Sequence, residues 1–172
     1  CEPWMTSLTA CGYMLIAEPD GSVECIDFSG QAPGKLDMDR YAMDPAGAKS
    51  FLGMPASRDL ANIKGYSAFC TPGVVRGFEL ALKRHGSWPW DRVLQPAIER
   101  ARNGLYVSWH TTLCIGIAAG DLAADPGTRA VFMPSGAPPE PGETLALTQL
   151  AATLQRLAEA GADDFYQGRI PE

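Results

Sequence analysis

Two amphipathic stretches with clear start and stop signals constrain the fold of this chain most strongly. In the first stretch, apolar residues recur at helical spacing, at Val74, Phe78, Ala81 and Leu82. Thr71 can cap this helix, Pro72 suits its first position, and Gly86 can end it. We therefore expect a helix that begins beside Thr71 and stops at Gly86.

The second stretch covers Thr148–Ala160. Its apolar stripe consists of Leu147, Leu150, Ala151, Leu154, Leu157 and Ala158. Gly161 follows directly and supplies the stop signal. Asp163–Gln167 predicts one further short turn. The neighbouring acids Asp163 and Asp164 point in different directions on a helix, which favours a solvated helix end over a catalytic pair.

A β-hairpin is predicted over residues 12–28. The apolar run Gly12–Ala17 precedes the turn sequence Pro19–Ser22. Apolar and polar residues then alternate over Val23–Phe28, as they do in a strand with one buried face. The chain therefore combines helices with at least one antiparallel strand pair.

Two stretches lack a helical or strand period, because they are rich in Gly, Pro and short polar residues. Residues 29–67 predict a loop with short helical turns near Asp39–Met43 and Arg58–Ile63. Residues 125–143 predict a connector. Between them, we expect a helix over 91–103 with Asp91 at its cap, and a third helix over Ser108–Ala124.

Composition bounds the class of protein. A chain of 172 residues suffices for one domain, and 46% hydrophobic residues allow a packed core. The formal charge of −6 argues against nucleic acid as a partner, and no apolar run has the length of a membrane span. Cys1 opens the chain without a Met or a basic segment, which predicts a truncated or processed chain.

The cysteines and histidines do not form a metal-binding pattern. The five cysteines are scattered, at Cys1, Cys11, Cys25, Cys70 and Cys114. The two histidines, His85 and His110, lie far apart in the sequence, so the spacing of a zinc site is missing. We predict no metal and no cofactor, and the scattered cysteines favour a reducing compartment.

Familiar catalytic patterns are also missing. The chain has no GxxxxGK[ST] phosphate loop, no GxGxxG after a strand and no GxSxG nucleophile turn. Trp88 and Trp90 suggest either a ligand platform or packing at a corner between helices. His85 in the last turn of a helix is explained by capping and packing. The residues alone therefore assign no catalytic group.

Six segments in order give the chain a family resemblance. They are residues 2–15 (EPWMTSLTACGYML), 26–38 (IDFSGQAP and LDM), 71–77 (TPGVVRG), 86–104 (GSWPW, QPAI and NG), 141–154 (PGE and QLAATL) and 164–168 (DFYQG). Together they resemble the large subunit of the gamma-glutamyltransferase family of N-terminal nucleophile hydrolases. The resemblance implies an α+β fold, the helix-rich part of an αββα sandwich, with residues 1–172 as a single partial domain.

The resemblance also implies a missing partner. Family precursors cut themselves into a large and a small subunit, and the nucleophile is the Thr freed at the start of the small subunit, whose own amine serves as base. No catalytic residue is thus expected in this chain, and a small-molecule amide is the implied substrate. Without the small subunit, sheet edges and apolar faces would be uncovered here, which predicts poor solubility.

Two departures from the family pattern bear on the substrate. Ser7, Thr9, Ala10 and Cys11 stand where the family has glycines, which would crowd a turn with positive φ. In family members that use glutathione, an Arg in the segment before Pro33 binds the α-carboxylate of the substrate. The family has two patterns for this segment, and the Arg aligns with Ser29 in one and with Gln31 in the other. We therefore expect Ser29 or Gln31 to face the substrate and to suit a neutral or smaller amide.

Three functions remain open at this point. The chain is part of an amide-cleaving hydrolase or acyltransferase, such as a glutathione hydrolase. Alternatively, it belongs to a non-catalytic homologue that serves as a scaffold or interaction partner. A third reading is a binding module built on Trp88 and Trp90. The resemblance leaves both a cytoplasmic and a periplasmic location open.

Overall fold

The computed structural model describes residues 7–45, 47 and 53–171. The resemblance carried by residues 2–6 therefore lies outside the described residues. The chain forms two compact units. We call Thr9–Val74 the hairpin unit, and we call Val75–Glu172, together with Ser7 and Leu8, the helical unit. That the whole chain is one partial domain of a larger fold stays a prediction.

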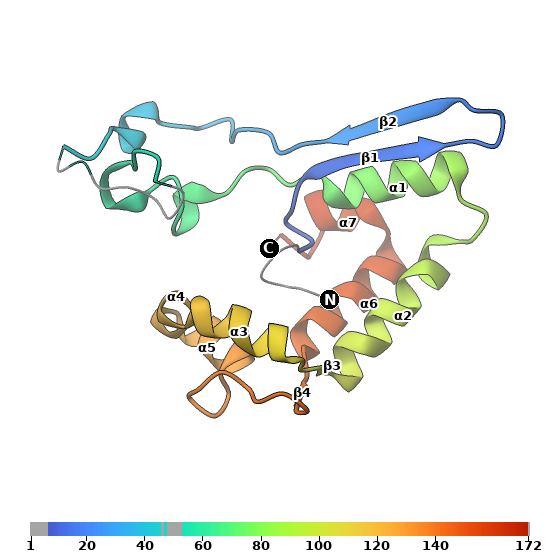
Figure 1. Ribbon diagram of the computed structural model, residues 1–172. Coiled ribbons are helices and arrows are strands. Elements are labelled where there is room, and N and C mark those ends of the chain that lie inside the picture. The colour runs from blue at the N-terminus through green and yellow to red at the C-terminus, as the bar shows by residue number, and fades with distance from the viewer. Residues whose placement is uncertain (1–6, 46, 48–52, 172) are drawn as a thin grey trace. The chain divides into compact units, whose positions relative to one another are not determined.

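The predicted hairpin is confirmed. Strands β1 (Gly12–Ala17) and β2 (Val23–Phe28) pair antiparallel, with Leu15 opposite Cys25 (Figure 1). The Gly21 N–H donates to the Glu18 carbonyl at 2.9 Å, and Gly21 has a φ of 87°, which suits a residue without Cβ. The turn therefore sets the register that places alternate side chains on opposite faces.

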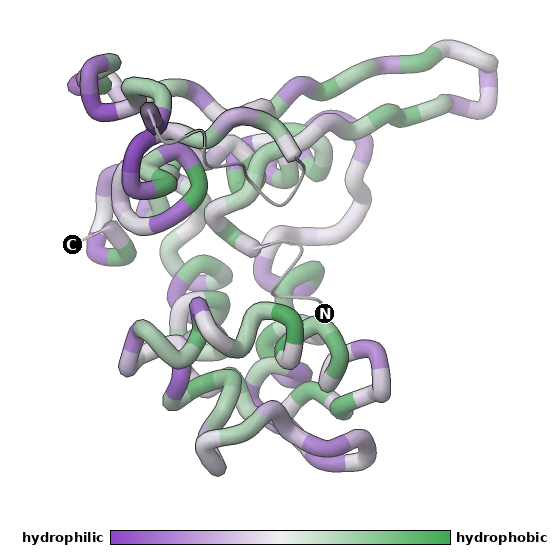
Figure 2. The backbone as a smooth tube through the Cα atoms, turned by 60° about the vertical axis from the view of Figure 1, so that its left-hand side comes forward, coloured by the Kyte–Doolittle hydropathy of each residue, from purple (hydrophilic) through white to green (hydrophobic). Residues whose placement is uncertain are grey.

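One face of the hairpin carries large apolar side chains in solvent. Tyr13, Leu15 and Val23 are 68%, 74% and 66% exposed, and register places them on the same face. The opposite face is more enclosed, with Ile26 only 3% exposed. Apolar and polar residues alternate along β2, whereas β1 is a nearly continuous apolar run, and Figure 2 colours the hairpin by this hydropathy.

The stretch after β2 folds without long elements, as the sequence predicted. Its 3₁₀ turns are η1 (Met38–Tyr41), η2 (Arg58–Leu60) and η3 (Tyr66–Ala68), and the first two match the expected turns. Two isolated antiparallel bridges organise the stretch. One joins Gln31 to Thr71 and the other joins Met43 to Ser57.

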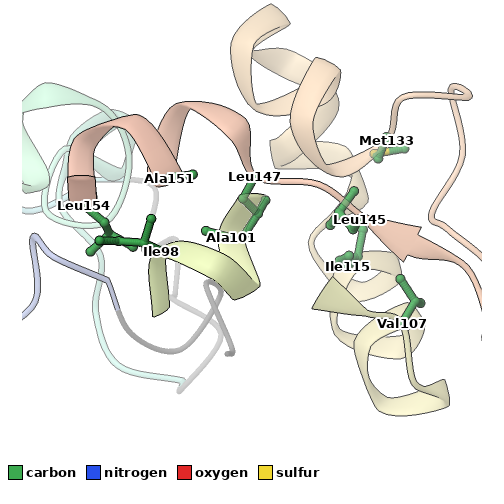
Figure 3. Close-up of a cluster of buried hydrophobic side chains, with 9 residues drawn as sticks. All are labelled: Ile98, Ala101, Val107, Ile115, Met133, Leu145, Leu147, Ala151 and Leu154. Atoms are coloured by element: carbon green, nitrogen blue, oxygen red, sulfur yellow. The ribbon is translucent and has the colours of Figure 1, made fainter. Parts of the chain in front are cut away.

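The core of the helical unit lies around two helices that run side by side, α2 (Trp90–Asn103) and α6 (Thr148–Ala160) (Figure 1). The buried cluster drawn in Figure 3 consists of Ile98, Ala101, Val107, Ile115, Met133, Leu145, Leu147, Ala151 and Leu154. The predicted bounds of α6 are confirmed, because Gly161 takes a φ of 82° and ends the helix.

Two predicted helix starts are wrong. Helix α1 (Val74–His85) begins after Thr71, because the Thr71 backbone already exchanges hydrogen bonds of 2.8 and 3.2 Å with Gln31. Its predicted end is confirmed at Gly86. Helix α2 begins with Pro89 at the cap, and Asp91 lies inside its first turn. An acid there still suits the positive end of the helix.

The stretch between α2 and α6 differs more from expectation. The predicted helix over Ser108–Ala124 is two helices, α3 (Trp109–Ile117) and α4 (Ala119–Ala124), separated at Ala118. The predicted connector contains helix α5 (Pro126–Phe132), which Asp125 caps with a 2.7 Å hydrogen bond from the Thr128 N–H. The short strands β3 (Leu105–Tyr106) and β4 (Thr144–Leu145) pair antiparallel and had no counterpart in the sequence analysis.

The last helix, α7 (Ala162–Gln167), matches the predicted short turn. Asp163 is exposed, as expected, and pairs with Arg76 of α1. The solvated interpretation is wrong for Asp164, whose side chain is 10% exposed and is held by the Arg156 guanidinium, with Nε at 2.7 Å. The Arg156 hydrogen bonds lower the pKa of Asp164.

None of the helices described here has both the length and the apolar character that crossing a bilayer requires.

Candidate functional site

The segment that leaves β2 carries both predicted substrate-binding residues. The Ser29 N–H donates to Asp27 Oδ1 at 2.8 Å, which forms a tight turn directly after the strand. Hydrogen bonding from Ser29 lowers the pKa of Asp27. The turn therefore presents a negative charge in solvent directly beside Ser29.

Gln31 has a fixed backbone and an exposed side chain. Its N–H and carbonyl both bond to Thr71, at 3.2 and 2.8 Å. Within the part of the chain that the structure describes, the Gln31 carboxamide has no hydrogen-bond partner. An exposed amide on a fixed backbone can both donate to and accept from a ligand.

Two glycines allow the segments to approach closely. A Cβ on Gly30 would clash with Cys70 Sγ and would lie 3.0 Å from Cys70 Cβ. A Cβ on Gly73 would lie 2.8 Å from the Phe28 carbonyl carbon. These contacts explain why the resemblance segments around Ser29 and Thr71 keep their glycines: only a residue without a side chain fits.

The four residues that replace family glycines cause no backbone conflict. Among the described residues, only Asp59 and Leu60 have positive φ without being glycine. Ser7, Thr9, Ala10 and Cys11 therefore lie outside the left-handed region. The expected crowding at positive φ does not arise, because this chain takes a backbone path that suits residues with a Cβ.

Trp90 is arranged as a packing residue, whereas Trp88 is 51% exposed. Trp90 Nε1 donates to the Leu157 carbonyl at 2.9 Å, which ties α2 to α6. The Arg92 guanidinium lies 3.9 Å from the centroid of the Trp88 ring and covers one of its faces.

No group of three or more His, Cys, Asp or Glu side chains in residues 7–45, 47 and 53–171 is placed to hold a metal ion.

Comparison with known proteins decides the family. The family model described as gamma-glutamyltranspeptidase matches residues 1–172. This chain belongs to the gamma-glutamyltranspeptidase family. The acylase ACY 1 proenzyme of Pseudomonas sp. (strain SE83) is 37% identical over 171 residues, which is 98% of this chain and 30% of that protein. The glutathione hydrolase proenzyme of Escherichia coli (strain K12) is 33% identical over 172 residues, 99% of this chain and 28% of that protein.

A solved structure of the family agrees with the fold. The gamma-glutamyltranspeptidase from Pseudomonas nitroreducens complexed with L-DON has a TM-score of 0.80 and 27% identity. The match covers 98% of this chain and 46% of that chain. The predicted α+β fold is confirmed as a helix-rich part of the N-terminal nucleophile hydrolase fold, and the chain covers the large-subunit region. It spans about a third of the length of the curated relatives it matches.

The sequence analysis missed the role of Asp27. It placed Ser29 at the family's Arg position but did not recognise that the carboxylate two residues earlier accepts a hydrogen bond from the Ser29 N–H. The Asp-x-Ser spacing of a tight turn was the available signal. The assignment of Ser29 and Gln31 to substrate binding remains a prediction.

Proposed function

We propose that this chain provides the large-subunit part of an enzyme of the gamma-glutamyltranspeptidase family that cleaves an amide bond and transfers the acyl group to water or to an amine. The N-terminal Thr nucleophile would come from the small subunit, whose own amine activates it. Relatives named acylase and glutathione hydrolase support this class of reaction.

The observation that carries the substrate proposal is the unpaired carboxamide of Gln31. It stands at one of the two positions of the family's carboxylate-binding Arg, on a backbone fixed by the Thr71 bridge. A neutral amide offers no charge to a substrate carboxylate, but it can pair with an amide or hydroxyl group. Gln31 therefore favours a substrate without the free α-carboxylate of a γ-glutamyl compound.

Ser29 contributes in a different way. Because Asp27 accepts from the Ser29 N–H and has a lowered pKa, its carboxylate places a negative charge beside this position. A negative charge repels a substrate carboxylate and so reinforces the preference for neutral acyl groups.

The test is kinetic and uses the complete precursor after self-cleavage. We expect the Gln31→Arg variant to raise kcat/KM for a γ-glutamyl anilide by roughly tenfold to a hundredfold, because a charge-assisted hydrogen bond contributes about 1.5–3 kcal/mol. The same variant should not improve cleavage of a neutral acyl anilide.

Gln95→Arg is the matched control, since Gln95 is an exposed glutamine on α2. An equal gain in both variants would show a general charge effect and would remove Gln31 from the site. If the wild-type precursor never matures and cleaves no amide, the scaffold alternative replaces the enzyme proposal.

A further inference from the structure

A cavity of about 360 Å³ lies wholly within the hairpin unit. Its lining includes three cationic side chains, Arg40, Arg58 and Lys64, and two anionic ones, Asp39 and Asp59. Among the described residues, no carboxylate forms an ion pair with the Arg40 or Arg58 guanidinium. Two guanidinium groups thus line one cavity without an ion-pair partner.

The loop that carries Arg58 is held in one conformation. The Ser57 side chain is buried, and its Oγ donates to Asn62 Oδ1 at 2.7 Å and accepts from the Asn62 N–H at 3.0 Å. Between them, Asp59 and Leu60 have φ values of 57° and 55°. Side chains disfavour this region, and loops that keep such residues are often ligand-binding loops.

The opposite part of the lining is also fixed. Arg40 lies in η1, which Asp37 caps through a 3.0 Å hydrogen bond from the Asp39 N–H. The Tyr41 hydroxyl next to it donates to the Ser67 carbonyl at 2.6 Å. The Ser67 hydroxyl donates to the Ala61 carbonyl at 2.8 Å. These hydrogen bonds therefore fix the backbone of the two segments that carry Arg40 and Arg58 before any ligand arrives.

A second cavity of about 260 Å³ adjoins the first, because both are lined by Arg40 and Ser67. Its lining adds apolar and aromatic residues and two charged ones, namely Pro33, Leu36, Tyr41, Tyr66, Phe69, Lys35 and Asp37. Tyr66 is 94% exposed and Phe69 is 61% exposed, and their rings meet edge to face at 6.3 Å. The two cavities together offer guanidinium groups and aromatic rings, and this combination suits a ligand with an acidic head and an apolar body.

We propose that the joined cavities bind a small carboxylic acid, with its carboxylate on Arg40 and Arg58 and its apolar or aromatic body against Tyr66 and Phe69. The guanidinium fork matches both carboxylate oxygens, which a lysine does not do. The chain as a whole carries a charge of −6 and repels anions, so binding requires the local positive charge of Arg40, Arg58 and Lys64. The inference goes beyond the proposed function, because such binding does not require amide cleavage.

The experiment is a titration of the purified protein with 3-phenylpropionate. Calorimetry measures the Kd, and amide NMR shifts locate the binding site. We expect saturable binding with a Kd on the order of 1 mM or lower, with shifts in residues 36–69. Arg40→Gln and Arg58→Gln should each weaken binding by roughly tenfold or more. Arg40→Lys should recover only part of the loss, because it restores the charge without the fork.

Arg100→Gln is the matched control, an exposed arginine on α2 that lies outside both cavities. Two ligand controls separate the head from the body of the acid. Neutral 3-phenylpropanamide and acetate should each bind at least about tenfold more weakly than the full acid. The proposal is overturned if the amide binds as tightly as the acid, if Arg100→Gln loses as much affinity as Arg40→Gln, or if no saturable binding occurs.

Discussion

At residue 30 the chain has no room for a side chain. The position lies between Ser29 and Gln31, and Cys70 fills the space that a Cβ would take. The sequence identified Ser29 and Gln31 through the family pattern, but it gave no sign of Cys70, because that contact joins segments far apart in the chain. Residue types can therefore suggest a site, while its close packing depends on tertiary contacts.

A Gly30→Ala variant should be destabilised by about 1–3 kcal/mol, because the added methyl group overlaps Cys70 Sγ. Chemical denaturation would measure the loss. Cys70→Ala in the same chain should recover part of it, since the sulfur is removed while the Cys70 Cβ remains 3.0 Å from the new atom. Equal losses in the single and double variants would show that the clash is not the cause.

At the scale of elements, local signals predicted some helices and missed others. Helix α6 has a full apolar stripe and a glycine stop, so its bounds were predictable. Helix α5 is short and contains Pro126 and Gly127, so its composition indicates a loop although Asp125 and Pro126 form a proper helix start. Strands β3 and β4 are two residues each, too short for any period to appear.

The pairing of Arg156 with Asp164 joins α6 to α7 and makes the free energy of unfolding depend on pH. The pKa of Asp164 lies below its ordinary value because Arg156 donates to the carboxylate. This contribution is therefore fully present above the ordinary aspartate pKa and is lost as the pH falls through the lowered, folded-state pKa.

We expect urea stability to fall below about pH 4 and the Asp164→Asn variant to lose less over that range. Asp163→Asn is the control, since Asp163 is 83% exposed and its pairing with Arg76 is largely screened. Parallel pH profiles for wild type and Asp164→Asn would contradict the prediction.

At the scale of the whole molecule, the family and the helix-rich α+β class were predictable because six segments fall in order over the chain. The cavity at Arg40 and Arg58 was not predictable, because a loop without periodicity brings its residues together. The exposed hairpin face agrees with the expectation of an uncovered apolar surface.

The isolated chain should therefore associate through the hairpin, and Leu15→Lys with Val23→Lys should raise the dimer Kd by about tenfold or more, because exposed apolar area drives association. Analytical ultracentrifugation over a concentration series measures this change. Val93→Lys, a 44% exposed position on α2, is the control. A wild-type chain that stays monomeric at all concentrations would refute the prediction.

The two backbone bridges of the hairpin unit are nested, and this sets an order of folding. The Met43–Ser57 bridge closes a shorter loop inside the one closed by Gln31 and Thr71. Closing a shorter loop costs less chain entropy, so the inner bridge can form first and shorten the effective length of the outer loop. The Ser57–Asn62 hydrogen bonds span only a few residues, so we also expect them to form before the bridge that fixes the backbone of Gln31.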